Sequence, residues 1–229
     1  MSIESDRGPW ANRAEAGREL GDAVRTVLAE RSDANPPAGD RPLVLGLPRG
    51  GVEVAAAVAD VVNGDLDVLV VRKAGVPWHR ELALGAVTAS GMRVHNTDVI
   101  AMSRVTDDDL EKAFERAERE AHEREHELRA GRPAAGIAGR VVVITDDGVA
   151  TGATALAAAQ SISGADPPPA RVILAVPVAP PSTVRRLSRH VDTVVTMREP
   201  EDFMAVGEWF IDFTQVEDDQ VRELLLARR

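Results

Sequence analysis

Short apolar runs recur along this chain, and stretches with helical spacing separate most of them. The runs are LVLG at 43–46, DVLVV at 67–71, VVVIT at 141–145, RVILAV at 171–176 and DTVVTM at 192–197. Buried strands that alternate with helices assemble into a parallel sheet, because each crossover lays a helix on one face. We therefore predict an α/β fold with a doubly wound, mainly parallel sheet flanked by helices.

The remaining segments predict a single domain over residues 1–229. Residues 10–30 have the spacing of an amphipathic helix. The core of the domain is expected at about 40–196, with a helical insertion at about 106–131 and a small hood formed by about 197–229. Within the core, LALGAVT and MRVHN flank a turn at 89–91, which predicts a hairpin.

The helical insertion is the most strongly patterned helix. It opens at Thr106 with Asp109 three residues later, the spacing of a capping box. Its apolar stripe is narrow, and oppositely charged residues such as Glu120 and Arg124 are four apart. We expect this helix to lie across the core with most of its surface in water.

Composition limits the classes of function. The net charge of −10 disfavours nucleic acid and anionic membranes as partners, and the absence of cysteine excludes thiolate chemistry. No run approaches the roughly 18 apolar residues of a membrane span, and the first residues lack the apolar core of a signal peptide. We expect a cytoplasmic protein. The acidic, lysine-poor composition fits a salt-adapted source and GC-rich codon bias equally well.

The segment VVVITDDGVATGAT at 141–154 carries the clearest chemistry. Asp146 and Asp147 would stand at the carboxyl end of a strand, where carboxylates can accept hydrogen bonds from two adjacent ribose hydroxyls. The following turn can surround a phosphate with backbone amides and with the hydroxyls of Thr151 and Thr154. Gly152 allows the backbone to approach the anion closely.

The segment does not match the sequence patterns of two other phosphate-binding loops. A Walker loop needs a lysine after its glycine, and a dinucleotide fold needs G-x-G-x-x-G; neither is present. An ordinary strand-to-helix turn remains the alternative for any one of these residues taken alone.

The segment resembles the signature of type I phosphoribosyltransferases, which is four apolar residues, two acids, a run of small residues and Thr-Gly-x-Thr. The resemblance implies phosphoribosyl pyrophosphate as donor, a nitrogenous base or related small molecule as acceptor, release of pyrophosphate and dependence on Mg²⁺. It implies that Asp146 and Asp147 contact the ribose, either of them also reaching the Mg²⁺ that arrives with the substrate. The 5-phosphate is then bound by Thr151, Gly152, Ala153 and Thr154, and Gly148, Val149 and Ala150 belong to the same substrate-binding loop.

Two more segments resemble parts of the same family. LPRGG at 47–51 stands where these enzymes carry a pyrophosphate loop, so Arg49, Gly50 and Gly51 are expected to bind pyrophosphate. VRKAGVPWHRELALG at 71–85 resembles the mobile catalytic loop of adenine phosphoribosyltransferases. It supplies Arg72, Lys73 and Glu81 as candidates, while Trp78 either stacks on a base or covers the closed loop.

Nearly the whole chain resembles a narrower group of phosphoribosyltransferases whose substrate these motifs do not define. The segment 203–213 is expected to join the hood above the site, with plain core packing as the equal alternative. A regulator that binds phosphoribosyl pyrophosphate or a nucleotide without catalysis is the alternative function, and hydrolysis or phosphorolysis of a phosphorylated sugar is a third. The identity of the acceptor and the formation of a homodimer stay open.

A competing motif lies in the long helix. His122, Glu123 and His126 match the H-E-x-x-H pattern of zinc proteases. A zinc protease needs that helix buried beside a third ligand, whereas the surrounding residues are charged on all sides. We interpret the motif as a solvated helix face.

Overall fold

The computed structural model describes residues 8–30 and 41–228, apart from the side chains of Arg80 and Glu81. Its main sheet has the order β2-β1-β6-β7-β8, and all four strand pairs are parallel. The strands are β1 (Leu43–Gly46), β2 (Asp65–Val68), β6 (Val141–Thr145), β7 (Arg171–Val178) and β8 (Thr193–Arg198). The predicted doubly wound, mainly parallel architecture is confirmed.

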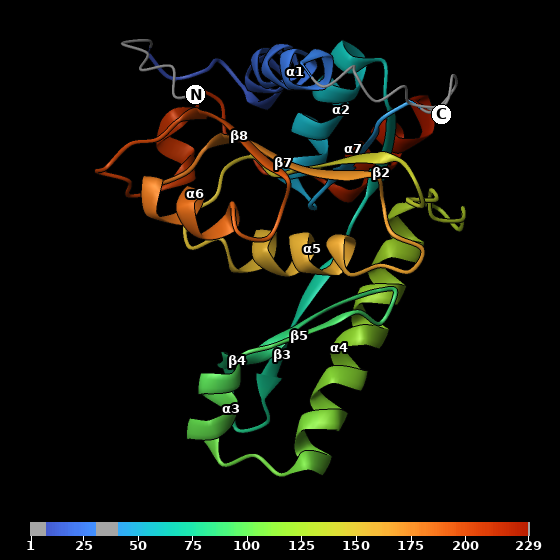
Figure 1. Cartoon of the computed structure of the whole chain (residues 1–229), viewed down its shortest axis with the longest axis vertical. Helices are drawn as coiled ribbons and strands as arrows, with labels where there is room; N and C mark the ends of the chain where they lie inside the picture. The colour runs from blue at the N-terminus through green and yellow to red at the C-terminus, as the bar shows by residue number, and fades with distance from the viewer. Residues whose placement is uncertain (1–7, 31–40, 229) are drawn as a thin grey trace.

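Helices cover both faces of this sheet (Figure 1). One face carries α1 (Arg13–Ala29) and α2 (Gly50–Val62), and the opposite face carries α5 (Ala153–Ser163) and α6 (Pro181–Leu187). The chain ends with the single-turn 3₁₀ helix η1 (Val206–Trp209) and with α7 (Asp218–Ala227). We call this unit the sheet lobe.

Alternation along the strands divides the core of the sheet lobe into two apolar layers. Val44, Val143 and Ile173 pack in the layer that includes α1 and α2. Their neighbours Leu45, Ile144 and Leu174 pack in the layer that includes α5. All six side chains are buried, as the twofold repeat of a strand requires when both faces are covered.

The remaining elements form a second unit, the hairpin lobe, which spans residues 71–128. It contains an antiparallel sheet with the order β3-β4-β5, formed by β3 (Val71–Val76), β4 (His79–Thr88) and β5 (Arg93–His95). The helices α3 (Thr97–Ser103) and α4 (Asp107–Leu128) complete it. In Figure 1 this lobe lies below the sheet lobe on the side of α5, and α4 runs along one edge to rejoin the sheet lobe.

The long helix matches its prediction at the start and differs in its packing. Thr106 and Asp109 form the expected capping box. However, only the second half of α4 meets the core of the sheet lobe, through Ala121 and Leu128. Phe114 and two alanines of α4 pack on the hairpin sheet, and Glu125 near its end is buried.

A second correction concerns the predicted strand at 67–71. The structure ends β2 at Val68 and begins β3 at Val71, so Leu69 and Val70 form a junction between the two lobes. The amide of Leu69 donates to the carbonyl of Gly46, and that of Val70 donates to the carboxylate of Glu125 at 2.9 Å. These bonds redirect the chain, and an apolar run alone does not reveal them.

A buried ionic cluster holds this junction. The Arg129 guanidinium contacts the carboxylates of both Asp67 and Glu125 and donates to the carbonyl of Val68 at 2.7 Å. Asp67 also accepts from the amide of Ala135 at 2.7 Å. All three charged side chains are buried, so their partners within the cluster replace water.

Candidate active site

The two acids of the β6 loop stand at the carboxyl end of the central strand. The carboxylate of Asp146 accepts from the amide of Asp147 at 2.9 Å, which turns the chain sharply after the strand. The carboxylate of Asp147 accepts from Nε of Arg13 at 2.8 Å. Burial and the neighbouring Asp147 carboxylate raise the pKa of Asp146 well above its usual value of 3.8.

Arg13 is a site residue that the sequence did not reveal. It is buried at the start of α1, where its guanidinium also donates to the carbonyl of Thr214 at 2.8 Å. The guanidinium lies 3.8 Å from the centroid of the Phe213 ring. The helical spacing of residues 10–30 gives no signal for these contacts, because their partners lie more than 130 residues away in the chain.

The small-residue turn after Asp147 leads directly into α5. Gly152 adopts a left-handed conformation with φ of 67°, which favours glycine, and α5 begins at the next residue. Ala153 and the hydroxyl-bearing residues Thr151 and Thr154 are exposed, whereas Val149 is buried in the core. The first helical turn therefore has amides without helical partners beside two exposed hydroxyl-bearing residues.

Residues of α6 support this turn from behind. The hydroxyl of Thr183 donates to the carbonyl of Ala150 at 2.7 Å, and the guanidinium of Arg186 contacts the carbonyl of Thr151. On the other side, the backbone of Gly148 lies so close to Val206 that a methyl group there would approach it to 2.5 Å. The shape of the turn is thus set by α6 and by η1.

The PRGG segment lies against the acidic pair. The amide of Leu47 donates to the carbonyl of Thr145 at 2.9 Å, and the Pro48–Arg49 peptide bond is cis. A β-carbon on Gly51 would lie 2.8 Å from the α-carbon of Asp146, and one on Gly50 would lie 2.0 Å from the Asp147 carboxylate. Only residues without a side chain allow the two loops to touch here.

Arginines from three elements line a cavity of 510 Å³ beside these loops. They are Arg49 at the start of α2, Arg72 on β3 and Arg124 on α4, and Thr154 lies on the same wall. The Nε atom of Arg72 is buried and has no hydrogen-bond partner among the described residues. A buried donor without a partner is rare in proteins, and a bound anion would satisfy it.

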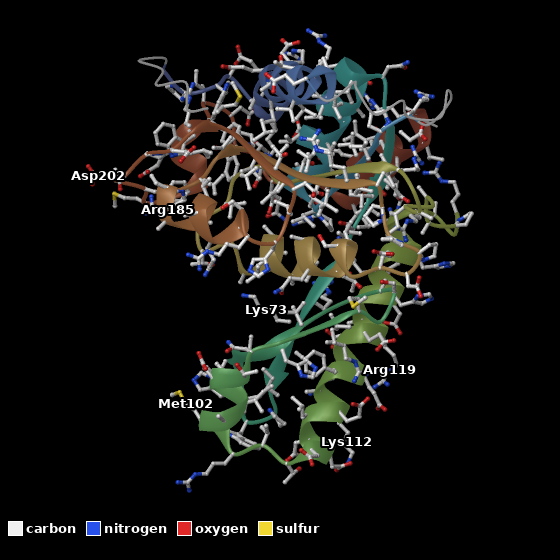
Figure 2. All side chains as sticks on the ribbon, in the orientation of Figure 1. Lys73, Met102, Lys112, Arg119, Arg185 and Asp202 are labelled. Atoms are coloured by element: carbon white, nitrogen blue, oxygen red, sulfur yellow. The ribbon has the colours of Figure 1, made fainter. Side chains whose placement is uncertain are left out.

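A second cavity, of 360 Å³, lies between α5 and the hairpin sheet. Its lining is mostly apolar, with Lys73, Gln160 and Arg186 among the polar residues. Figure 2 shows Lys73 on the side of the hairpin that faces α5. Val71 and Thr154 line both cavities, so the apolar space adjoins the arginine-lined one.

The predicted mobile loop is the β3–β4 hairpin. Trp78 stands at its turn with 63% of its surface exposed, and it is not among the residues that line either cavity. The Glu81 side chain lies outside the described part of the chain, so its role stays a prediction. The structure therefore gathers Arg49, Arg72 and Thr154 around one cavity, while Lys73 faces the other.

The structure also shows where the H-E-x-x-H motif and the aromatic segment at 203–213 lie. His122 and His126 are exposed on α4, and the described residues contain no cluster of three His, Asp or Glu side chains suited to a metal ion. The aromatic segment at 203–213 packs in the apolar layer with Trp10, through Phe210 at 5.6 Å between ring centroids. It also borders the site through the contacts of Phe213 and Val206 described above.

Within the described ranges, no helix combines the length and apolarity of a membrane crossing.

Comparison with known proteins identifies the family. A model of the phosphoribosyl transferase domain matches residues 12–209, which include both loops of the site. The chain belongs to this family. Among solved structures, the crystal structure of TT1426 from Thermus thermophilus is similar along the whole chain. It is 40% identical and superposes with a TM-score of 0.78, covering 96% of this chain and 99% of that one.

Curated relatives come from two strains of Mycobacterium tuberculosis and are named "Putative phosphoribosyl transferase" MT0597 and Rv0571c. Each is 43% identical over 223 residues, or 96% of this phosphoribosyl transferase chain. The match covers 46% of each relative, so the chain spans about half the length of these proteins.

Proposed function

We propose that this chain transfers the phosphoribosyl group of phosphoribosyl pyrophosphate to a small nitrogenous acceptor and releases pyrophosphate. The observation that carries the proposal is the contact between the PRGG loop and the acidic pair, beside a cavity lined by arginines. Such a site offers carboxylate acceptors, helix-terminal amides and guanidinium groups to one ligand. A sugar with a phosphate at one end and a diphosphate at the other requires these three chemistries.

Each part of the donor is assigned to a different set of protein groups. Asp146 and Asp147 accept hydrogen bonds from the ribose hydroxyls, and residues 151–154 bind the 5-phosphate at the start of α5. Arg49 and Arg72 bind the diphosphate, with Lys73 approaching from the hairpin. The buried Nε of Arg72 supports this assignment, because the diphosphate would give it an acceptor.

The residues fit Mg²⁺ that arrives with the substrate rather than a resident metal. Hard oxygen ligands are present in Asp146 and Asp147, but one oxygen of Asp147 is already paired with Arg13. Mg²⁺ commonly binds through one or two carboxylates together with substrate phosphates. When bound, it would neutralise charge on the departing diphosphate.

The reaction then depends on positioning and on charge. A nitrogen lone pair of the acceptor forms a bond to C1 of the ribose as the bond from C1 to the diphosphate oxygen breaks, and the proton that this nitrogen carried is released to water. The electron pair of that bond leaves with pyrophosphate, where Arg49, Arg72 and Lys73 stabilise the negative charge. Asp146 and Asp147 hold the ring for in-line attack, and closure of the hairpin would exclude water.

Replacing the acidic pair tests the donor site. In Asp146→Asn with Asp147→Asn we expect no binding of phosphoribosyl pyrophosphate in titration calorimetry, because both hydroxyl acceptors lose their charge. Glu201→Gln with Asp202→Asn is the matched control, since these adjacent acids are exposed and outside the site. Near-normal binding by the first double variant would contradict the assignment.

A second measurement separates an enzyme from a regulator. Incubation with phosphoribosyl pyrophosphate, Mg²⁺ and a panel of nitrogenous bases should release pyrophosphate in a base-dependent way. Tight binding with no release across the panel would favour the non-catalytic regulator. Release that does not depend on a base would indicate hydrolysis instead.

A further inference from the structure

Arg124 is the member of the arginine-lined cavity that no family motif accounts for. It belongs to α4, outside the loops that carry the family signature, and the sequence placed it in a surface pair with Glu120. The structure instead pairs it with Asp218 of α7 and directs it to the cavity that Arg49 and Arg72 also line. We propose that Arg124 is a third diphosphate-binding arginine and fixes the preference of this cavity for a diphosphate. This inference rests on the proposed function.

The position of Arg124 is fixed by a bidentate ion pair. Its two terminal nitrogens each lie 2.5 Å from a carboxylate oxygen of Asp218. The side chain keeps only 20% of its surface exposed. A guanidinium has five N–H donors, so this pair leaves three for other acceptors, and the carboxylate of Glu127 lies 3.5 Å from one terminal nitrogen.

The same carboxylate connects Arg124 to the pyrophosphate loop. A terminal nitrogen of Arg49 lies 3.7 Å from Asp218 and 3.5 Å from Glu217. Asp218 thus contacts guanidinium groups from α2 and from α4 at the same time. We infer that Asp218 positions both arginines on one wall of the cavity, so that their remaining donors face a common ligand.

The charge of the cavity favours a ligand with more than one phosphoryl group. Three guanidinium groups line it together with the Glu127 carboxylate, while Asp218 and Glu217, which pair with two of these arginines, are not among the lining residues. Each guanidinium can bind two phosphoryl oxygens in a fork, and a single phosphate offers fewer oxygens than three forks can bind. A diphosphate presents oxygens to several forks at once.

Calorimetric titration with three ligands tests this role. The probes are inorganic pyrophosphate and phosphoribosyl pyrophosphate, each with Mg²⁺, and ribose 5-phosphate, which lacks the diphosphate. Arg124→Gln should weaken binding of both diphosphates by roughly 10- to 100-fold, the range for loss of a hydrogen bond to a charged group. Ribose 5-phosphate should bind within about twofold of the wild-type affinity, because its phosphate is bound at α5.

Two further variants keep the test decisive. Arg124→Lys keeps the charge and an ion pair with Asp218 but loses the fork, so it should recover only part of the diphosphate affinity. Arg119→Gln makes the same change at an exposed position of α4, labelled in Figure 2, and should leave all three affinities unchanged. Circular dichroism melting curves establish that each variant is folded.

Each outcome decides between the two proposals. Wild-type diphosphate affinity in Arg124→Gln, with a loss in Arg49→Gln, would overturn the inference and leave the proposed function intact. An equal loss for ribose 5-phosphate would show that Arg124 only holds α4 in place, and this also overturns it. A wild-type protein that binds neither diphosphate would contradict the proposed function, and the inference would fail with it.

Discussion

The sheet lobe and the hairpin lobe are held together by different physical means. The sheet lobe has two apolar layers on opposite faces of a parallel sheet. The hairpin lobe has one small apolar cluster around Phe114 and Leu84, and charged contacts join it to the sheet lobe at Arg129 and Arg124. Burial therefore stabilises the first lobe, while ion pairs, together with the burial of Ala121 and Leu128 of α4 in the layer of α1 and α2, set the position of the second.

This difference bears on the site because each lobe supplies a different part of it. The loops of the sheet lobe provide carboxylates, amides and Arg49. The hairpin lobe provides Arg72, Lys73 and Arg124, all of them cationic. A ligand with a sugar at one end and a diphosphate at the other would bridge the two lobes.

Removing the cation of the buried ionic cluster should have the largest effect on stability. Arg129→Met leaves the carboxylates of Asp67 and Glu125 buried without their cation, which costs about 3–5 kcal/mol in free energy of unfolding. The loss should shrink as the pH falls, because burial already raises the pKa of Glu125 and protonation removes the uncompensated charge. Urea unfolding at several pH values measures both effects.

The control for this prediction is Arg119→Met, an exposed substitution on the same helix, which should change stability by no more than about 0.5 kcal/mol. If Arg129→Met is as stable as the wild type, the joint between the lobes is not electrostatic, and the comparison above is wrong.

A smaller effect is expected where the two loops of the sheet lobe touch. In Gly51→Ala the new β-carbon would lie 2.8 Å from the α-carbon of Asp146 and 2.9 Å from the carbonyl of Thr145. The loops must separate, at a cost of about 1–3 kcal/mol, and donor affinity should fall with stability. Gly136→Ala is the matched control, because nothing lies within 4 Å of its added β-carbon. Unaltered donor binding in Gly51→Ala would show that the contact is dispensable.

The smallest effect concerns the pH dependence of ribose binding. Because the pKa of Asp146 is raised, its carboxylate gains a proton at a pH above the usual 3.8. Affinity for ribose 5-phosphate without metal should fall as the pH drops through this raised pKa, by up to about tenfold per pH unit. The ratio of wild-type to Asp146→Asn affinity isolates this effect, since the ligand phosphate titrates equally with both proteins. A ratio that stays constant as the pH falls to the usual carboxyl value of 3.8 would contradict the assignment.

The parallel sheet of the sheet lobe could be predicted from the sequence, although the bounds of β2 could not. The runs at 43–46 and 141–145 are β1 and β6, because apolar runs bounded by turns are local signals. The break at Leu69 and Val70 could not be predicted, since it depends on Glu125 from a distant helix. Local patterns describe strands and turns well, but they do not report which carboxylate reaches which amide.

The same limit applies to the site. Its motif residues lie at strand ends, where the parallel sheet brings them together, and a signature in the sequence marks them. Arg13 and Asp218 carry no such mark, because an arginine at a helix start and an acid in a first turn are common. Their importance arises from contacts across 134 and 94 residues of chain, which only the folded structure reveals.

The contacts of Arg13 also order the assembly of the site during synthesis. Trp10 forms an isolated β-bridge with Phe210, and Arg13 donates to the carbonyl of Thr214 while pairing with Asp147. A ribosome adds residues from the amino end, so Arg13 and Asp147 emerge long before Phe213 and Thr214, which contact Arg13. A nascent chain that has already formed its sheet would therefore still lack the residues that contact Arg13 beside Asp147.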